Sequence, residues 1–208
     1  MTVKLTTTTN VSVDGVMRGC GGLDEDRRGG FERGGWERPL GRFDAEVGAF
    51  IVEVYQRADG FLFGRWTYEL FAGYWGVMAE WDYPIAAALN TRPKYVASTT
   101  LTDPQWADTT VLSGDVAAAV GELKAKPGGE LQVHGSGNLV RSLLDNRLVD
   151  EMTLLTYPVV VGQGTRLFPA TGPDIALELV DGRSTPKGVS IQVYRPTGRP
   201  QYATVTAD

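Results

Sequence analysis

The fold is decided by residues 130–168, which read "ELQVHGSGNLVRSLLDNRLVDEMTLLTYPVVVGQGTRLF". A short strand-like run, "ELQVHG", passes through Gly135, Ser136 and Gly137 into "NLVRSLLDN", where apolar residues recur on one side as in a helix. A long strand-like run, "EMTLLTYPVVV", follows. Strand, helix and strand in this order are typical of parallel strands joined by a crossover helix, so the stretch predicts an α/β protein.

The same alternation continues on both sides of this stretch. Further strands are predicted at "VKLTTTTNVSVDG", "GFLFG", "KYVAST" and "TTVL", and further helices after Asp44, over "RWTYELFAGYW", over "DYPIAAALN" and after Asp115. Two alternating strands close the chain, with apolar residues at Ile175, Leu177 and Leu179 and then at Val189, Ile191 and Val193. We therefore expect one domain over residues 1–208, with a central, mostly parallel mixed sheet flanked by helices and an antiparallel C-terminal hairpin.

Composition and charge restrict the class of protein. The 208 residues are 42% hydrophobic and 22% charged, values that are ordinary for a globular protein with a core. The formal net charge of −5 argues against a nucleic-acid partner. The chain has one cysteine, Cys20, and no run that resembles a signal peptide or a membrane span. These features predict no membrane association and a cytoplasmic location.

Four predicted strands end in residues that suit phosphate groups. Glycines let a backbone approach a phosphate, and the free N–H groups of a helix start attract an anion. Arginine and hydroxyl side chains bind phosphate oxygens directly. The four strand ends carry Gly64, Arg65 and Thr67; Ser98 and Thr99; Ser113 and Gly114; and Gly135, Ser136 and Gly137. Each of these also has a plain reading as a turn or a solvent-facing residue, but four together indicate an anionic ligand.

The same residues carry a resemblance to a family. The pieces "SVDGVM", "GRWTYE", "KYVAST", "VHGSGNLVRSLL" and "VDEMTLLTYPVVVGQGTRLF" are similar, in this order, to the dihydrofolate-reductase-like superfamily, and more closely to the reductase domain of bacterial riboflavin biosynthesis. The resemblance implies an NADPH-dependent enzyme related to 5-amino-6-(5-phosphoribosylamino)uracil reductase. Gly64, Arg65 and Thr67 would then hold the adenine-side phosphates, with Ser98 and Thr99 near the 2′-phosphate. Gly135, Ser136, Gly137, Asn138 and Leu139 would wrap the pyrophosphate, and Asn10 and Met17 would flank the nicotinamide.

The chain also departs from the family pattern. True dihydrofolate reductases carry a substrate-binding acid in the helix before the "GR.T" motif, and the same spacing here reaches Gly48. The aspartate of the riboflavin branch's "S.DG" motif corresponds to Asp14, which we expect either to face the substrate, as the catalytic candidate, or simply to form a turn with Gly15. The His-x-Glu and Cys-x-x-Cys zinc set of the partner deaminase does not occur, so no metal site is expected.

The expected substrate pocket is formed by Asp14, Trp36, Trp75 and Tyr157. The glycine-rich segment Gly19–Gly41 is long enough to act as a lid over it, and Trp36 within that segment argues against disorder. His134, the only histidine, is expected to be structural. Asp14, Tyr157 or a water molecule could each donate the proton, and the residues do not choose among them.

The predicted function is reduction of a small heterocyclic or carbonyl compound by NADPH. An NADP(H)-binding module or sensor without turnover is the alternative, and a fold that has lost its cofactor is a third reading. The resemblance, together with the aromatic-rich segment "ELFAGYWGVMAEW" at residues 69–81, also predicts a homodimer.

Overall fold

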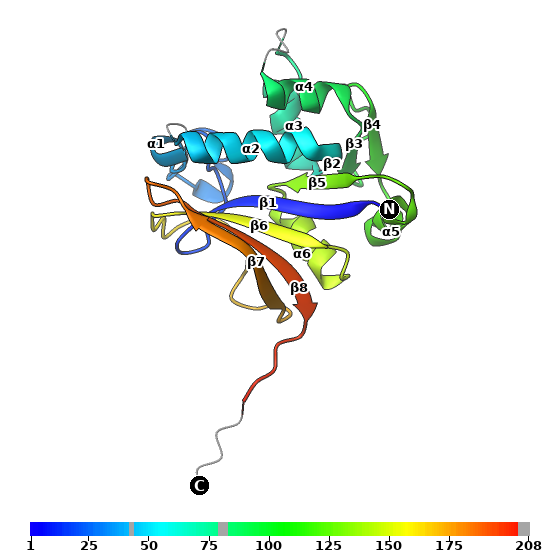
Figure 1. Cartoon of the computed structure of the whole chain (residues 1–208). Coiled ribbons are helices and arrows are strands. Elements are labelled where there is room, and N and C mark those ends of the chain that lie inside the picture. Colours follow the sequence, from blue (N-terminus) through cyan, green and yellow to red (C-terminus); the bar gives the residue numbers. More distant parts are fainter. Residues whose placement is uncertain (42–43, 79–82, 204–208) are drawn as a thin grey trace.

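A single eight-stranded sheet organises the molecule (Figure 1). The structure is a computed structural model, and it describes residues 1–41, 44–78 and 83–203. The strands are β1 (Lys4–Ser12), β2 (Ala58–Gly64), β3 (Lys94–Ala97), β4 (Thr109–Leu112), β5 (Glu130–His134), β6 (Glu151–Tyr157), β7 (Ala176–Ser184) and β8 (Ser190–Gly198).

The strand order is β4-β3-β2-β5-β1-β6-β8-β7. Every pair from β4 to β6 is parallel, and β8 runs antiparallel to both β6 and β7. β1 lies between β5 and β6, so the two strands of the opening stretch are separated by the N-terminal strand. The predicted mostly parallel sheet with an antiparallel C-terminal hairpin is confirmed.

Helices cover both faces of the sheet. They are α1 (Arg38–Gly41), α2 (Ala45–Arg57), α3 (Arg65–Tyr74), α4 (Pro84–Thr91), α5 (Val116–Ala125) and α6 (Gly137–Asp145), with a 3₁₀ turn at Arg28–Gly30. α5 and α6 pack in one hydrophobic cluster, while α2, α3 and α4 pack in two others on the opposite face. Figure 1 shows α2 lying across that face, above β5 and β1. Successive side chains of β2 point to opposite faces of the sheet. Leu62 faces α6, and its neighbours Phe61 and Phe63 face α2, α3 and α4.

Two of the predicted helix starts are capped by carboxylates. Asp44 accepts hydrogen bonds from the N–H groups of Glu46 and Val47 at the start of α2, and Asp115 accepts one from Ala118 at the start of α5. Such caps satisfy N–H groups that have no partner within the helix. The sequence signal at both positions is therefore confirmed.

The C-terminal half departs from expectation in two places. The long strand "EMTLLTYPVVV" ends at Tyr157, because Pro158 has no N–H to donate to a neighbouring strand. In the edge strand β7 the alternating Leu177 and Leu179 are 37% and 56% exposed, more than the half-buried face that such alternation usually indicates. Val189, which directly precedes β8, and Ile191 and Val193 within it are buried.

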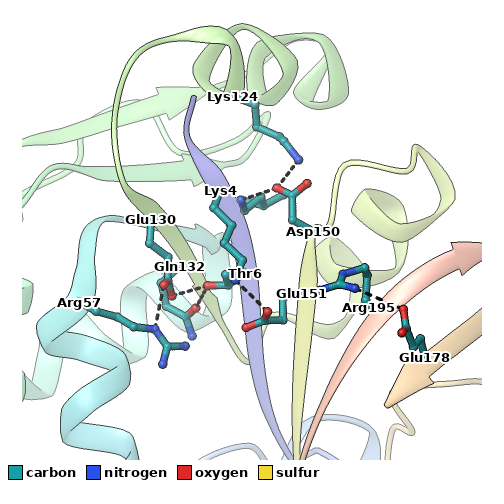
Figure 2. A network of polar contacts seen from close by, with 11 residues as sticks. Lys4, Thr6, Arg57, Lys124, Glu130, Gln132, Asp150, Glu151, Glu178 and Arg195 are labelled. Atoms are coloured by element: carbon teal, nitrogen blue, oxygen red, sulfur yellow. Dashed lines mark hydrogen bonds and ion pairs between the residues drawn. The ribbon is translucent and has the colours of Figure 1, made fainter. Parts of the chain in front are cut away.

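The amino-terminal ends of the central strands are held by ion pairs (Figure 2). Lys4 opens β1 and contacts Glu151 at 2.8 Å, and Arg57 contacts Glu130 at 2.8 Å. Lys124 contacts Asp150 at 2.5 Å. The polar groups at this end of the sheet bind one another, whereas a cavity opens at the opposite, carboxyl ends of the same strands.

Candidate active site

A cavity of about 1050 Å³ lies at the carboxyl ends of β1, β2, β5 and β6. Small-molecule pockets usually occupy about 300–1,000 Å³, so this one is large, and open α/β sheets bind their ligands at this end of the strands. Twelve of the residues predicted for the site line it: Asn10, Met17, Gly64, Arg65, Thr67, Trp75, Gly135, Ser136, Gly137, Asn138, Leu139 and Tyr157. The other predicted residues lie outside its described lining: Asp14, Trp36, Ser98, Thr99, Ser113 and Gly114.

Two helices begin at the cavity without side-chain caps. The residues that precede their first turns, Gly64 for α3 and Ser136 for α6, make no side-chain hydrogen bond to those turns. The two starts also touch, since the N–H of Gly64 donates to the Ser136 hydroxyl oxygen at 3.0 Å. The first-turn N–H groups of both helices therefore point into one glycine-lined space with no capping carboxylate. This arrangement attracts an anion.

Two glycines shape this cradle. Gly135 has a φ of +59°, in the left-handed region, and is followed by Ser136 with a φ of +53°. A Cβ at Gly137 would lie 2.3 Å from the sulfur of Met17, so only glycine lets Met17 lie against the start of α6. These contacts place Met17 beside the cradle.

Arg65 lies at the edge of the cavity and already has two partners. Its Nε is 2.7 Å from a Glu69 carboxylate oxygen, and its Nη1 donates to the Thr100 hydroxyl at 2.5 Å. The side chain is 44% exposed. Ser98, one residue beyond β3, instead caps its own turn by accepting hydrogen bonds from the N–H groups of Thr100 and Leu101.

Asp14 lies in the turn that follows β1 and is held there by hydrogen bonds. Its carboxylate accepts hydrogen bonds from the Ser12 hydroxyl and from the N–H groups of Val161 and Gly162, at 2.7, 2.9 and 2.9 Å. The Ser12 hydroxyl, followed by the two N–H groups, lowers the pKa of Asp14 to about 2. A carboxylate held ionised and outside the cavity lining cannot serve as a proton donor near neutral pH.

The predicted aromatic residues lie at different distances from the cavity. Tyr157 ends β6 and is fully buried at the cavity wall, and Trp36 packs edge-on against it with ring centroids 5.7 Å apart. Trp36 therefore supports the pocket from behind, with its indole N–H donating to the carbonyl of Arg18 at 2.9 Å. Trp75 lines the cavity, and its ring stacks on the ring of Tyr83 with the two centroids 5.8 Å apart.

The glycine-rich segment folds against the cavity. Phe31 and Trp36 belong to the hydrophobic cluster beneath α2, and backbone bonds from Gly35 to Gly19 and from Glu37 to Cys20 join its two sides. Sequence reasoning missed the four acids of this segment that line the cavity, Asp24, Glu25, Asp26 and Glu37. Burial raises the pKa of the Glu25 and Glu37 carboxyls. Their only sequence signal is their position in a segment that was itself predicted to cover the site.

His134 ends β5 at the cavity and packs between aromatic rings. The centroids of Tyr55 and Phe71 lie 5.5 and 5.6 Å from its ring. Burial lowers the pKa of His134 to about 4, so the imidazole is neutral near pH 7. It is poorly suited to donate a proton in that range.

This pKa leads to a prediction about acid stability. At pH values between about 4 and 6.5, His134 is protonated in the unfolded chain and neutral in the folded protein. Unfolding free energy should fall as pH drops through this window, by up to about 3 kcal/mol. His134→Phe, which keeps a ring between Tyr55 and Phe71, should remove this part of the loss. Urea unfolding of both proteins from pH 7 to 4 measures the difference, and parallel curves would refute it.

Three buried polar atoms at the cavity have no partner among the described residues. They are the hydroxyl oxygen of Thr9 and the amide oxygen of Asn10, which are neighbours on β1, and Nδ1 of His134 at the end of β5. Buried polar atoms without a partner cost about 1–3 kcal/mol each. A bound ligand that offers hydrogen bonds would remove this cost. Among the described residues, no group of three or more His, Cys, Asp or Glu side chains is arranged to hold a metal ion.

A family model decides the identity of this fold. The model described as the RibD C-terminal domain matches residues 3–191, nearly the whole chain. The chain belongs to the RibD C-terminal domain family. The glycine cradle and the β6 stretch are the parts of the sequence that first suggested this family. Membership in it supports a reductase-type function related to riboflavin biosynthesis.

Individual relatives agree with this RibD-type assignment. A Bacillus subtilis (strain 168) protein, named uncharacterized protein YyaP, is 27% identical over 157 residues, which are 74% of this chain and 82% of that protein. A solved structure from Shewanella sp. PV-4, whose name assigns it provisionally to riboflavin biosynthesis, has a TM-score of 0.71 at 22% identity, over 94% of this chain and 99% of the other. A pyrimidine reductase-like protein from Corynebacterium diphtheriae has a TM-score of 0.62 at 13% identity, over 94% and 92%. The two structures share the dihydrofolate-reductase-like fold.

Proposed function

We propose that this protein is an NADPH-dependent reductase that delivers hydride to a small heterocyclic or carbonyl compound. The observation that supports it most strongly is the pair of uncapped helix starts of α3 and α6, joined by the bond from Gly64 to Ser136 at the cavity. A dinucleotide pyrophosphate is the anion that such a cradle suits, because backbone N–H groups and the positive ends of two helix dipoles converge on it.

The residues present fit a nicotinamide dinucleotide. The cradle from Gly135 to Leu139 would bind the pyrophosphate, and Arg65 with Thr67 would bind the phosphate on the adenosine side. Asn10, whose amide oxygen has no partner, and Met17 would position the nicotinamide ring. When bound, the reduced nicotinamide would supply the hydride. The chain's own contribution is to orient the two reactants and to exclude water, which the packed segment over the cavity would do.

A module that binds NADP(H) without turnover is the second candidate, because Gly48 stands where dihydrofolate reductases carry their substrate-binding acid. The two candidates differ in one measurement. An enzyme should consume NADPH when carbonyl and pterin compounds are screened, seen as loss of absorbance at the reduced cofactor's band. A module should bind NADPH and leave that absorbance unchanged across the whole screen.

Cofactor choice depends on Arg65 in this proposal. The 2′-phosphate that separates NADPH from NADH carries nearly two negative charges, and a guanidinium suits it. Because Arg65 is 44% exposed and shares its charge with Glu69, we expect Arg65→Ala to weaken NADPH binding about tenfold and to leave NADH nearly unchanged.

Arg57→Ala is the matched control for Arg65→Ala. Arg57 is 42% exposed and is likewise ion-paired, with Glu130 at the other end of the sheet. Dissociation constants for both cofactors in the three proteins give the answer. Equal weakening of NADPH and NADH by Arg65→Ala would rule out this role for Arg65.

A homodimer is also part of the proposal. The segment first considered for the interface ends in Ala79, Glu80 and Trp81, which lie outside the described residues. The edge strand β7 offers a clearer surface, with Leu177, Leu179 and Val180 exposed beside a sheet edge that has no neighbour among the described strands. Light scattering should give twice the 22.5 kDa chain mass, and Leu179→Asp should halve it, whereas Val77→Asp should not. A monomeric wild type would contradict the proposal.

A further inference from the structure

The outer part of the glycine-rich segment is attached differently from its base. Residues 21–30, here called the tip, contribute no side chain to the three hydrophobic clusters of the described residues. Phe31 and Trp36, which follow the tip, are buried in one of these clusters. Polar and stacking contacts therefore hold the tip in place, while apolar packing holds the base of the segment.

Four side chains form a continuous row across the cavity, from the turn after β1 to the first turn of α3. The Nε of Arg18 lies 3.6 Å from the Asp26 carboxylate, and the Nη2 of Arg28 lies 2.5 Å from the same carboxylate. The Arg28 guanidinium in turn lies over the Trp66 ring, 3.8 Å from its centroid. All four residues line the cavity, so the row joins two of its walls.

Asp26 fixes the guanidinium that lies over the ring. Its two carboxylate oxygens accept hydrogen bonds from Nε and Nη2 of Arg28, at 2.8 and 2.5 Å. The hydrogen bond from Arg28 lowers the pKa of Asp26, so the carboxylate is ionised near neutral pH. A guanidinium held within about 6 Å of a tryptophan ring is attracted to the electron-rich face of that ring.

The stacking contact lies at the edge of the cavity and is weak enough to open. The Arg28 side chain is 53% exposed and Trp66 is 41% exposed. At exposed sites a cation over a tryptophan ring shifts an equilibrium by only about two- to fivefold. On the other side of the cavity, Arg18 and Gln163 donate hydrogen bonds to the carbonyls of Arg28 and Gly30, at 2.6 and 3.2 Å. These bonds hold the tip to the β1 side when it leaves α3.

We propose that Arg28 and Trp66 form a latch that holds the tip closed across the cavity, and that opening of this contact sets the rates at which ligands enter and leave. The latch goes beyond the proposed function, because the ligand-free chain already carries the contact. Its position next to Arg65 means that the closed tip meets α3 beside the helix start that forms part of the anion cradle.

Hydrogen exchange of the ligand-free protein tests the latch directly. The N–H groups of Gly21, Glu25 and Arg28 donate hydrogen bonds within the tip, so their exchange reports how often it opens. Trp66→Ala should make these amides exchange about two- to fivefold faster, the factor expected for loss of an exposed cation–π contact. Circular dichroism checks that the variant is folded.

Tyr74→Ala is the matched control for Trp66→Ala. Tyr74 lies on the same helix and is 54% exposed, and its ring packs against Trp75. Its loss should leave exchange in the tip at the wild-type rate. If Trp66→Ala and Tyr74→Ala give the same exchange, the latch does not exist.

Variants of the two neighbouring arginines assign the effect to the stacking contact. Arg27 is 64% exposed and pairs with Asp24, so Arg27→Ala is the control for Arg28→Ala. Because Arg28 also binds Asp26, Arg28→Ala alone removes more than the stacking. In the double variant, Trp66→Ala should therefore add nothing to the effect of Arg28→Ala. Effects that multiply in the double variant would show that the two side chains act independently, against the proposal.

Stopped-flow mixing with NADPH measures the consequence for ligand exchange, and this part rests on the proposed function. Trp66→Ala should raise the association and dissociation rates by the same two- to fivefold and leave the dissociation constant nearly unchanged, because a closed tip slows entry and exit alike. A change in the dissociation rate alone would mean that Trp66 contacts the cofactor and does not control access. Faster exchange in ligand-free Trp66→Ala, with no NADPH binding to wild type, would overturn the reductase and leave the latch.

Discussion

Ser136→Asp is expected to weaken NADPH binding at least a hundredfold while the protein stays folded. Ser136 precedes α6 with a φ of +53°, a conformation that aspartate tolerates better than most residues. A carboxylate there would compete with the ligand for the first-turn N–H groups of α6. Two charges about 4 Å apart repel by about 4 kcal/mol near a protein surface, so a pyrophosphate would be displaced. Fluorescence titration with NADPH measures the loss.

Ser113→Asp is the control for this change. Ser113 also follows a parallel strand, β4, but it is exposed and lies outside the described cavity lining. It was predicted from sequence as a cofactor contact, and we now expect its replacement to leave NADPH affinity unchanged. The melting temperature of both variants should stay within a few degrees of wild type. If Ser136→Asp binds NADPH normally, the cradle at α6 is not the pyrophosphate site.

Phe63→Ala should cause the largest loss of stability. Phe63 is fully buried in β2. Its ring centroid lies 5.4, 6.2 and 6.4 Å from those of Phe71, Phe61 and Trp106. Replacing a buried phenylalanine by alanine costs about 3–5 kcal/mol. For a chain of this length that corresponds to a drop in melting temperature of about 6–20 °C.

Phe168→Ala is the control for Phe63→Ala, and calorimetry measures the melting temperature of both variants. Phe168 is 45% exposed, so its removal should change the melting temperature by no more than a few degrees. The same ring cluster supports α3, whose first turn faces the cavity. Phe63→Ala should therefore also weaken NADPH binding at temperatures where it is still folded. Similar melting temperatures for the two variants would show that β2 is not the centre of the core.

Local patterns were enough to predict the fold, because they act over short distances. The apolar run at residues 60–64 marked β2 as a strand, and the caps at Asp44 and Asp115 marked two helix starts. The exposure of β7 was not predictable in this way. Its apolar alternation is that of a half-buried strand, yet Leu179 is 56% exposed.

The candidate site could likewise be predicted only where its residues are close in the sequence. The cradle was visible in the sequence because glycines and a helix start are adjacent at Gly135 to Gly137. The sequence left Asp14 open between a substrate contact and a turn residue, because its partners, Val161 and Gly162, are 147 and 148 residues away. Glu25 and Glu37 were missed because no periodicity orients a loop, and their placement depends on the packing of residues such as Phe31 and Trp36.

Direct titration of the wild-type protein with NADPH and NADH tests the central claim. We expect saturable NADPH binding in the micromolar range, about tenfold tighter than NADH, and a preference that shrinks as salt rises because Arg65 is half exposed. The absence of NADPH binding, or equal affinity for the two cofactors at low salt, would contradict the proposal that this cavity is an NADPH site.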